Sequence, residues 1–207
     1  MKDIYFDNSA TTQVSAKAIA AALEMMTADY GNPSSAHHYG VMAARKLSDC
    51  RAQLAGLLNV NANELIFSGS GSESNNLAIF GAARACPPQR RRIIAGAGEH
   101  ASVLLAGKAL AQAGYDLQPA PLDRLGRVDL AALSELLTPE TALVSLAQVN
   151  NETGTEQDLA AVGALIKVKP LRFKVNSGSW PRASWISTVC GSSMPFHSGT
   201  PEGGSIT

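Results

Sequence analysis

Ser68-Gly-Ser-Gly-Ser-Glu-Ser-Asn-Asn76 lies between two short apolar runs, 65–67 and 77–80. Small and hydroxyl-bearing residues between apolar runs predict a strand that passes directly into a helix. Ser70 and Glu73 stand at capping-box spacing, which places the helix start within this loop. Glycine lets the backbone approach an anion closely, and the first amide groups of a helix are unpaired donors at its positive end. The loop is therefore a candidate phosphate site, although an isolated run of this composition would indicate a flexible linker.

Helix and strand patterns alternate along about the first 175 residues of the chain. Helices are expected at 15–26, 36–58, 73–85, 102–113, 129–137 and 158–168, and strands at 65–67, 92–95, 115–119, 142–147 and 171–175. Regular alternation implies crossover connections, and hence an α/β fold: a three-layer sandwich with a mainly parallel sheet covered on both faces. Ligands of such sheets gather beyond the carboxyl ends of the strands.

Composition excludes several classes of function. Lysine plus arginine and aspartate plus glutamate number 17 each, so no overall field attracts nucleic acid or an anionic membrane. No segment approaches the roughly 20 apolar residues that cross a bilayer. The three cysteines show no paired spacing, which argues against a disulfide framework or a cysteine metal site. A cytoplasmic protein without a metal is the expectation.

Polar clusters follow several of the predicted strands or fall near the start of the chain. They are Glu99-His100, the stretch 148–154, Asp7-Asn-Ser-Ala-Thr-Thr12 and the stretch 31–37. Taken singly, each is explained by turn and capping chemistry, and a lone histidine at a strand end is more often structural than reactive. Together with the glycine-rich loop, five such clusters favour a common site.

The same five motifs, in this order, closely resemble the cysteine desulfurase family, enzymes of class V aminotransferase type with the fold type I of pyridoxal 5'-phosphate (PLP) proteins. The motifs are Asp7-Asn-Ser-Ala-Thr-Thr12, Gly31-Asn-Pro-Ser-Ser35 with His37, the loop 68–76, Glu99-His100 and Asn150-Asn-Glu-Thr-Gly154. The resemblance extends from about Ile4 to about Val175. It implies sulfur metabolism and iron-sulfur cluster assembly as the biological context.

The resemblance also implies roles for individual residues. Gly71 and Ser72 fall where the family binds the cofactor phosphate, and His100 falls where an imidazole stacks on the pyridine ring and assists proton transfer. Asn151 matches the asparagine that hydrogen-bonds the phenolic oxygen of the ring. Residues of the N-terminal segment correspond to the substrate side of the pocket: Asn8, Ala10 and Thr11. In the family, PLP draws electrons from cysteine, an enzyme thiol takes the sulfur as a persulfide, and alanine is left.

Parts that this chemistry requires are absent from the sequence. The family's acidic partner of the pyridine nitrogen aligns with Asn176, and a glutamine that contacts the ring oxygen aligns with Ser179. The Schiff-base lysine of the family has no counterpart, because no lysine follows Lys174. Covalent attachment of PLP is therefore not expected. None of the three cysteines has a context that would replace the nucleophilic cysteine of the family's C-terminal loop.

The tail from Asn176 to Thr207 differs in composition from the residues before it. It has no leucine, aspartate or lysine, but eight serines and both tryptophans. We expect residues 1–175 to form a partial PLP-binding large domain, incomplete at its C-terminus, and residues 176–207 to be a divergent or frameshifted tail with little order.

Two classes of function stay open at this level. The first is a PLP-dependent cysteine desulfurase, or a relative such as a selenocysteine lyase or another class V aminotransferase, inactive in this chain alone. The second is a noncatalytic truncated product that binds PLP or associates with subunits. The resemblance implies a cysteine-like substrate, a homodimer, and a sulfur-acceptor or scaffold protein as partner. A dinucleotide site is a poor fit because Ser74 occupies the position of the third glycine, and a P-loop lacks its Gly-Lys-Ser/Thr.

Overall fold

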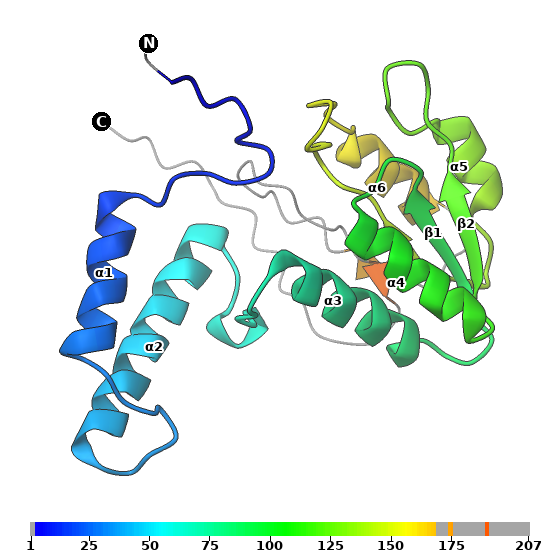
Figure 1. Cartoon of the computed structure of the whole chain (residues 1–207). Helices are drawn as coiled ribbons and strands as arrows, with labels where there is room; N and C mark the ends of the chain where they lie inside the picture. The colour runs from blue at the N-terminus through cyan, green and yellow to red at the C-terminus, as the bar shows by residue number, and fades with distance from the viewer. Residues whose placement is uncertain (1–2, 169–173, 176–188, 191–207) are drawn as a thin grey trace, which may run out of the picture. The chain divides into compact units, whose positions relative to one another are not determined.

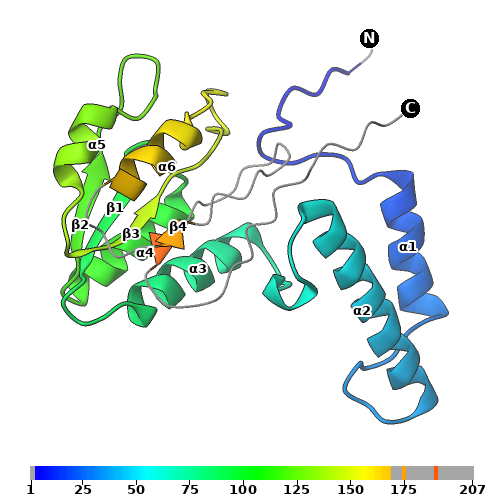
Figure 2. The same ribbon diagram turned by 180° about the vertical axis from the view of Figure 1, so that it is seen from behind.

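The computed structural model describes residues 3–168, 174–175 and 189–190. The described residues form two compact units. The first comprises residues 3–69 with 151–154. The second comprises residues 70–150 and 155–168 with the two short strands at 174–175 and 189–190. Figures 1 and 2 show the elements of each unit from opposite sides.

The first unit contains the helices α1 (Ala16–Thr27) and α2 (His38–Leu58) and the short 3-10 helix η1 (Ala62–Glu64). As predicted, α1 begins behind Ser15, whose side chain accepts a hydrogen bond from the amide of Ala18. The helix expected from residue 36 begins two residues later, because the Nδ1 atom of His37 caps α2 by accepting from the Gly40 amide. Asn59 ends α2 in the left-handed conformation typical of a C-cap.

The predicted strand at Leu65–Phe67 is wrong, since this segment is neither helix nor strand in the structure. A strand needs a neighbour that completes its ladder of backbone hydrogen bonds, and none of the strands that the structure describes pairs with it. Instead, the Leu65 carbonyl accepts from the guanidinium of Arg51, which also lies 4.6 Å from the centre of the Phe67 ring. The glycine-rich loop is therefore preceded by an irregular segment.

The second unit contains a parallel three-stranded sheet in the order β2-β1-β3. The strands are β1 (Arg92–Gly96), β2 (Asp116–Ala120) and β3 (Thr141–Ser145), joined by helical crossovers. Each lies within about the range that the sequence predicts. The parallel direction brings the carboxyl ends of all three strands, at Gly96, Ala120 and Ser145, to one edge of the sheet.

Four helices cover the sheet of the second unit on its two faces (Figures 1 and 2). They are α3 (Gly71–Ala85), α4 (Ala101–Gln112), α5 (Leu130–Leu136) and α6 (Leu159–Val168). Along β1, Ile93 packs with residues of α3 and α4, whereas the next residue, Ile94, packs with residues of α5 and α6. Both isoleucines are fully buried. The three-layer α/β sandwich is confirmed, because alternate side chains of one strand enter two separate cores.

Two short strands complete the second unit, β4 (Lys174–Val175) and β5 (Val189–Cys190), which pair antiparallel. The predicted strand at 171–175 is described only at its last two residues. The expectations for Asn176, for Ser179 and for most of the tail lie outside the described residues. Within the described ranges, no helix is long and apolar enough to cross a membrane, and no group of side chains is suited to bind a metal ion.

Candidate functional site

The glycine-rich loop forms the N-terminus of α3. Ser70 is the N-cap, with its Oγ accepting from the amide of Glu73 at 3.2 Å, as the capping-box spacing predicts for this half of the motif. Gly71 and Ser72 are the first two helical residues and both are exposed. The first backbone hydrogen bond of the helix runs from the Ser74 amide to the Ser70 carbonyl, so the amides of Gly71 and Ser72 have no acceptor within the helix and are available donors at its positive end. The space beside the Gly71 Cα atom is open: apart from its chain neighbours and the backbone of its own helix, no heavy atom lies within 4 Å of where a Cβ atom would lie.

The donors at this terminus are uncharged. The stretch 68–76 contains no lysine or arginine, and its one ionisable residue is Glu73. Attraction of an anion here would therefore depend on backbone amides, the Ser72 hydroxyl and the helix dipole.

His100 follows β1 and is the N-cap of α4. Its Nδ1 atom accepts a hydrogen bond from the Ser102 amide at 3.1 Å and lies 2.8 Å from the Ser102 Oγ. The ring is exposed, whereas Ser102 is 8% exposed. The local structure thus holds one edge of the imidazole against α4 and leaves the rest of the ring accessible.

A side chain of α3 joins this arrangement. The Asn75 Nδ2 atom donates to the Ser102 Oγ at 2.7 Å. Asn75 lies one helical turn beyond Ser72, and α3 and α4 run side by side in both ribbon views (Figures 1 and 2). The hydrogen bond therefore links the second turn of α3, whose first turn carries the candidate anion site, to the first turn of α4, which His100 caps. Neither Asn75 nor Ser102 was expected from the sequence.

The loops that follow β1 and β3 are tied together beside His100. The Glu99 carboxylate accepts from the amide of Ala147, and the Asn150 side chain donates to the Gly98 carbonyl at 2.8 Å. Burial raises the pKa of the Glu99 carboxyl above its ordinary value, and the hydrogen bond from Ala147 opposes part of that rise. Glu99 is thus a partly buried acid that holds the loop of His100 to the end of β3.

Further hydrogen bonds join residues 155–157 to the loop that precedes α5. The Gln157 side chain accepts from the Val128 amide and donates to the Gly126 carbonyl, both at 2.8 Å. Gly126 has a φ of 75°, which favours glycine at this turn. The Thr155 hydroxyl donates to the Leu125 carbonyl nearby.

The remaining predicted site residues belong to the first unit. Asn8 and Ala10 lie in a turn in which the Asp7 carbonyl accepts from the amides of Ala10 and Thr11, at 3.2 and 3.3 Å. Asn151 lies in the turn 151–154 and donates from its side chain to the Glu152 carboxylate at 2.9 Å. All four predicted residues are exposed.

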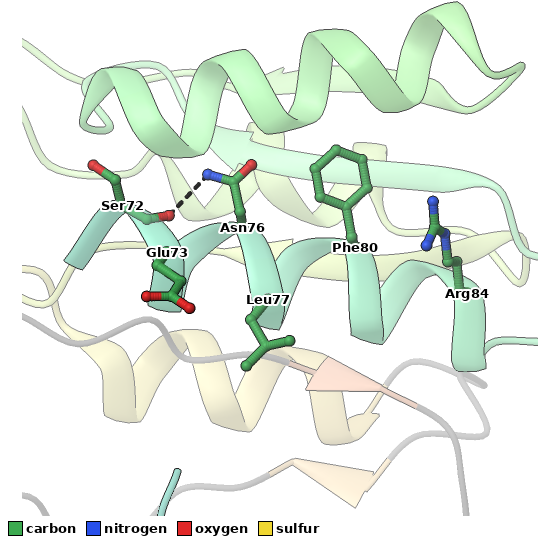
Figure 3. Close-up of a pocket in the computed structure, with 6 residues that line it drawn as sticks. All are labelled: Ser72, Glu73, Asn76, Leu77, Phe80 and Arg84. Atoms are coloured by element: carbon green, nitrogen blue, oxygen red, sulfur yellow. Dashed lines mark hydrogen bonds between the residues drawn. The ribbon is translucent and has the colours of Figure 1, made fainter. Parts of the chain in front are cut away.

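An open groove runs along α3 beside the glycine-rich loop (Figure 3). The Asn76 side chain donates to the Ser72 carbonyl at 2.8 Å at one end, and the Arg84 guanidinium lies 5.6 Å from the Phe80 ring centre at the other. The groove is lined by a single helix: Ser72, Glu73, Asn76, Leu77, Phe80 and Arg84. A surface formed by one helix does not enclose a small molecule, so this groove, which includes Ser72 at its end, is an open face of α3.

A model of the family described as aminotransferase class-V matches residues 4–177. The chain belongs to the class-V aminotransferase family. This match covers the glycine-rich loop, His100 and the segment around Asn151, so all the predicted site residues lie within it.

Related proteins of this family include cysteine desulfurases. The chain is 41% identical to cysteine desulfurase 2 of Trichormus variabilis over 177 residues, which are 86% of this chain and 44% of that protein. It is 34% identical to cysteine desulfurase IscS 1 of Archaeoglobus fulgidus, covering 78% of this chain and 42% of that protein. The chain thus spans about half the length of the curated relatives it matches.

Solved structures agree with the sequence comparison. A NifS-like protein superposes on 81% of this chain with a TM-score of 0.78 at 34% identity, and 46% of that protein is covered. The structure of SspA in complex with cysteine superposes on 81% of this chain with a TM-score of 0.75 at 29% identity, and 48% of that protein is covered. The α/β fold of this family is thereby confirmed, and the resemblance to cysteine desulfurases read from the sequence is confirmed as well.

Proposed function

We propose that this chain carries the phosphate-binding and ring-contacting part of a PLP site that serves cysteine desulfurization. The reaction would convert L-cysteine to L-alanine and pass the sulfur to an enzyme thiol as a persulfide. The observation that carries the proposal is the link between the start of α3 and His100 through Asn75 and Ser102. This link supports the proposal because it joins a candidate anion site to an aromatic ring, the two groups that a phosphorylated heteroaromatic cofactor needs.

The donor set suits a phosphate ester. The amides of Gly71 and Ser72 and the Ser72 hydroxyl would bind its oxygens, and the helix dipole would favour their negative charge. The open space beside Gly71 lets a phosphate approach the backbone without displacing a side chain. The lack of a basic side chain in the loop gives amide and hydroxyl donors the main part in this binding.

His100 would contact the cofactor ring. Its exposed imidazole can stack on a pyridine ring and can hold or move a proton at Nε2. Asn151 would donate to the phenolic oxygen of that ring, and Asn8, Ala10 and Thr11 would line the substrate side. These five roles follow from the matching motifs.

When bound, PLP supplies an electron sink for breaking bonds at the α and β carbons of an amino acid. No lysine follows Lys174 in this sequence, so we expect this chain to hold PLP by noncovalent contacts. For the whole protein, we propose turnover of cysteine, a homodimer, and a sulfur-acceptor or scaffold protein as partner. A noncatalytic role in cofactor binding or subunit association is the alternative.

Equilibrium dialysis of the full chain against PLP and against pyridoxal tests the phosphate site. We expect PLP to bind more tightly than pyridoxal, because only PLP carries the ester that the α3 amides would bind. Ser72→Ala should weaken PLP binding and leave pyridoxal binding unchanged. Ser134→Ala, the same change on α5, is the matched control. Equal binding of the two compounds, or no effect of Ser72→Ala, would contradict the proposal.

Borohydride treatment followed by mass spectrometry separates covalent from noncovalent binding. Reduction fixes PLP to a lysine wherever an imine has formed, which adds the mass of the cofactor. We expect the bound PLP to be removed by dialysis after reduction, with no single lysine modified stoichiometrically. Conversion of L-cysteine to alanine by this chain alone would show that the missing lysine is dispensable, and would decide for the catalytic reading.

A further inference from the structure

The contact between His100 and Ser102 determines where the imidazole carries its proton. The Ser102 backbone amide can only donate, and it lies 3.1 Å from the His100 Nδ1 atom. Nδ1 must therefore present a lone pair, and the proton of the neutral ring resides on Nε2. This backbone donor favours the Nε2–H tautomer as long as the ring stays in place against α4.

The side chains of Asn75 and Ser102 reinforce the same proton position. When Asn75 Nδ2 donates to the Ser102 Oγ at 2.7 Å, the serine hydroxyl is free to direct its own proton to Nδ1, which lies 2.8 Å away. Nδ1 then accepts two hydrogen bonds. Ser102 is 8% exposed and Asn75 is half-buried, so water competes weakly with these bonds.

We propose that Asn75 and Ser102 are positioning residues that fix His100 as the Nε2–H tautomer and direct Nε2 outward. Within the part of the chain that the structure describes, Nε2 has no hydrogen-bond partner, so it is the ring nitrogen left for a ligand. The importance of this nitrogen for a cofactor rests on the proposed function. The tautomer itself does not, because it is a property of the chain without a ligand.

A purely structural reading of the same contacts makes a different prediction. If Asn75 and Ser102 only join α3 to α4, removing them would lower stability and leave the proton on Nε2. If they position the ring, removing them would change the ratio of the two tautomers. A measurement of the proton position therefore separates the two readings, which a stability measurement cannot do.

Long-range proton–nitrogen NMR spectra of the full chain, labelled with ¹⁵N at histidine, report which ring nitrogen is protonated. The chain has four histidines, and the signals of His100 are assigned from their loss in His100→Gln. Spectra are recorded at a pH of about 8, above the ordinary pKa of histidine. We expect Nδ1 of His100 at the shift of an unprotonated nitrogen and Nε2 at the shift of a protonated one.

Two variants test the relay of hydrogen bonds from Asn75 through Ser102 to His100, each at a different residue. Ser102→Ala removes the hydroxyl, and Asn75→Asp replaces a donor by a carboxylate, which can only accept and so draws the serine proton away from His100. Both should increase the fraction of His100 with the proton on Nδ1. Ser134→Ala should leave the spectrum unchanged. Because Asn75→Asp preserves the size of the side chain, it tests the relay even where Ser102→Ala disturbs α4.

Two results would overturn the proposal. One is a wild-type spectrum in which Nδ1 of His100 is protonated or in which His100 matches the exposed His38. The other is unchanged His100 signals in both variants. Failure of the proposed function gives a different pattern, in which the His100 tautomer is fixed as expected but PLP does not bind. The binding and NMR measurements thus fail separately.

Discussion

The carboxylate of Glu99 accepts a hydrogen bond from the backbone amide of Ala147, 48 residues further along the chain. The contact joins the loop after β1 to the end of β3 and fixes the residue next to His100. Because Glu99 is partly buried, its charge is less well solvated than in water, and burial raises the pKa of its carboxyl above 4.5. Stability should therefore respond to the protonation of this one group.

Ionisation of Glu99 should make the folded chain less stable as the pH rises through the range in which this carboxyl loses its proton. A carboxyl with a raised folded pKa binds more protons in the native state than in the unfolded state, so its contribution is most favourable below the unfolded pKa and declines above it. Glu99→Gln removes this dependence and keeps an acceptor for Ala147. We expect the melting temperature of Glu99→Gln to rise relative to that of the wild type as the pH increases from about 4.5. Thermal unfolding followed by circular dichroism at several pH values measures this difference, and Glu135→Gln on α5 is the control. If the melting temperatures of Glu99→Gln and the wild type changed in parallel with pH, the raised pKa of Glu99 would be contradicted.

Asp116 should have the opposite dependence. The side chain of Gln118 and then Arg92, whose Nε lies 2.7 Å from the Asp116 Oδ2, lower the pKa of this carboxyl below 3.8. A depressed folded pKa stabilises the native state above the unfolded pKa, and that contribution is lost as pH falls through the folded pKa. Asp116→Asn should cost less than about 1 kcal/mol near neutral pH, since the pair is partly exposed. Urea unfolding at neutral and acid pH measures the difference, which should shrink in acid; Asp49→Asn on α2 is the matched change.

The core between the sheet and helices α3 and α4 should be sensitive to lost volume. Leu143 of β3 is fully buried in this core, whereas Leu105 of α4 is 62% exposed. Leu143→Ala should lower the free energy of unfolding by about 2–5 kcal/mol, through lost burial and the cavity that remains. Leu105→Ala should change it by less than about 0.5 kcal/mol. Denaturant titration of both variants provides the comparison, and equal effects would show that this core is not packed as the structure has it.

The sequence predicted the elements with regular patterns well. The strand β1 and the helices α3 to α6 agree with the predicted ranges to within about two residues, because their apolar residues repeat at the period of a helix or mark a short buried strand. The segment Leu65–Phe67, which was wrongly predicted as a strand, has a comparable apolar run, but none of the described strands pairs with its backbone. An apolar run alone does not reveal whether a ladder partner is present.

The candidate site could be proposed from the sequence only where its residues form motifs along the chain. The glycine-rich loop and His100 stand in such motifs, and the structure finds both at the starts of helices. Asn75 and Ser102 were missed because their contact crosses 27 residues and depends on how α3 packs on α4. Spacing along the chain gives no sign of a contact between two helices. One signal was present for Ser102: it follows His100 by two residues, the position from which a backbone amide donates to an N-cap side chain.

Gly96 at the end of β1 should not tolerate a side chain, because it lies against the contact between Glu99 and the end of β3. A Cβ atom there would meet the Glu99 Oε1 at 3.0 Å and the Leu146 Cδ2 at 3.3 Å. Gly96→Ala should therefore displace the Glu99 carboxylate and cost about 1–3 kcal/mol, the usual range for overpacking. Hydrogen exchange of the Ala147 amide should accelerate in this variant, since that amide loses its acceptor. In Gly81→Ala, the same change inside α3 where nothing lies within 4 Å, we expect a gain of about 0.5–1 kcal/mol and unchanged exchange at Ala147; protection of Ala147 in both variants would show that Gly96 does not support the loop of His100.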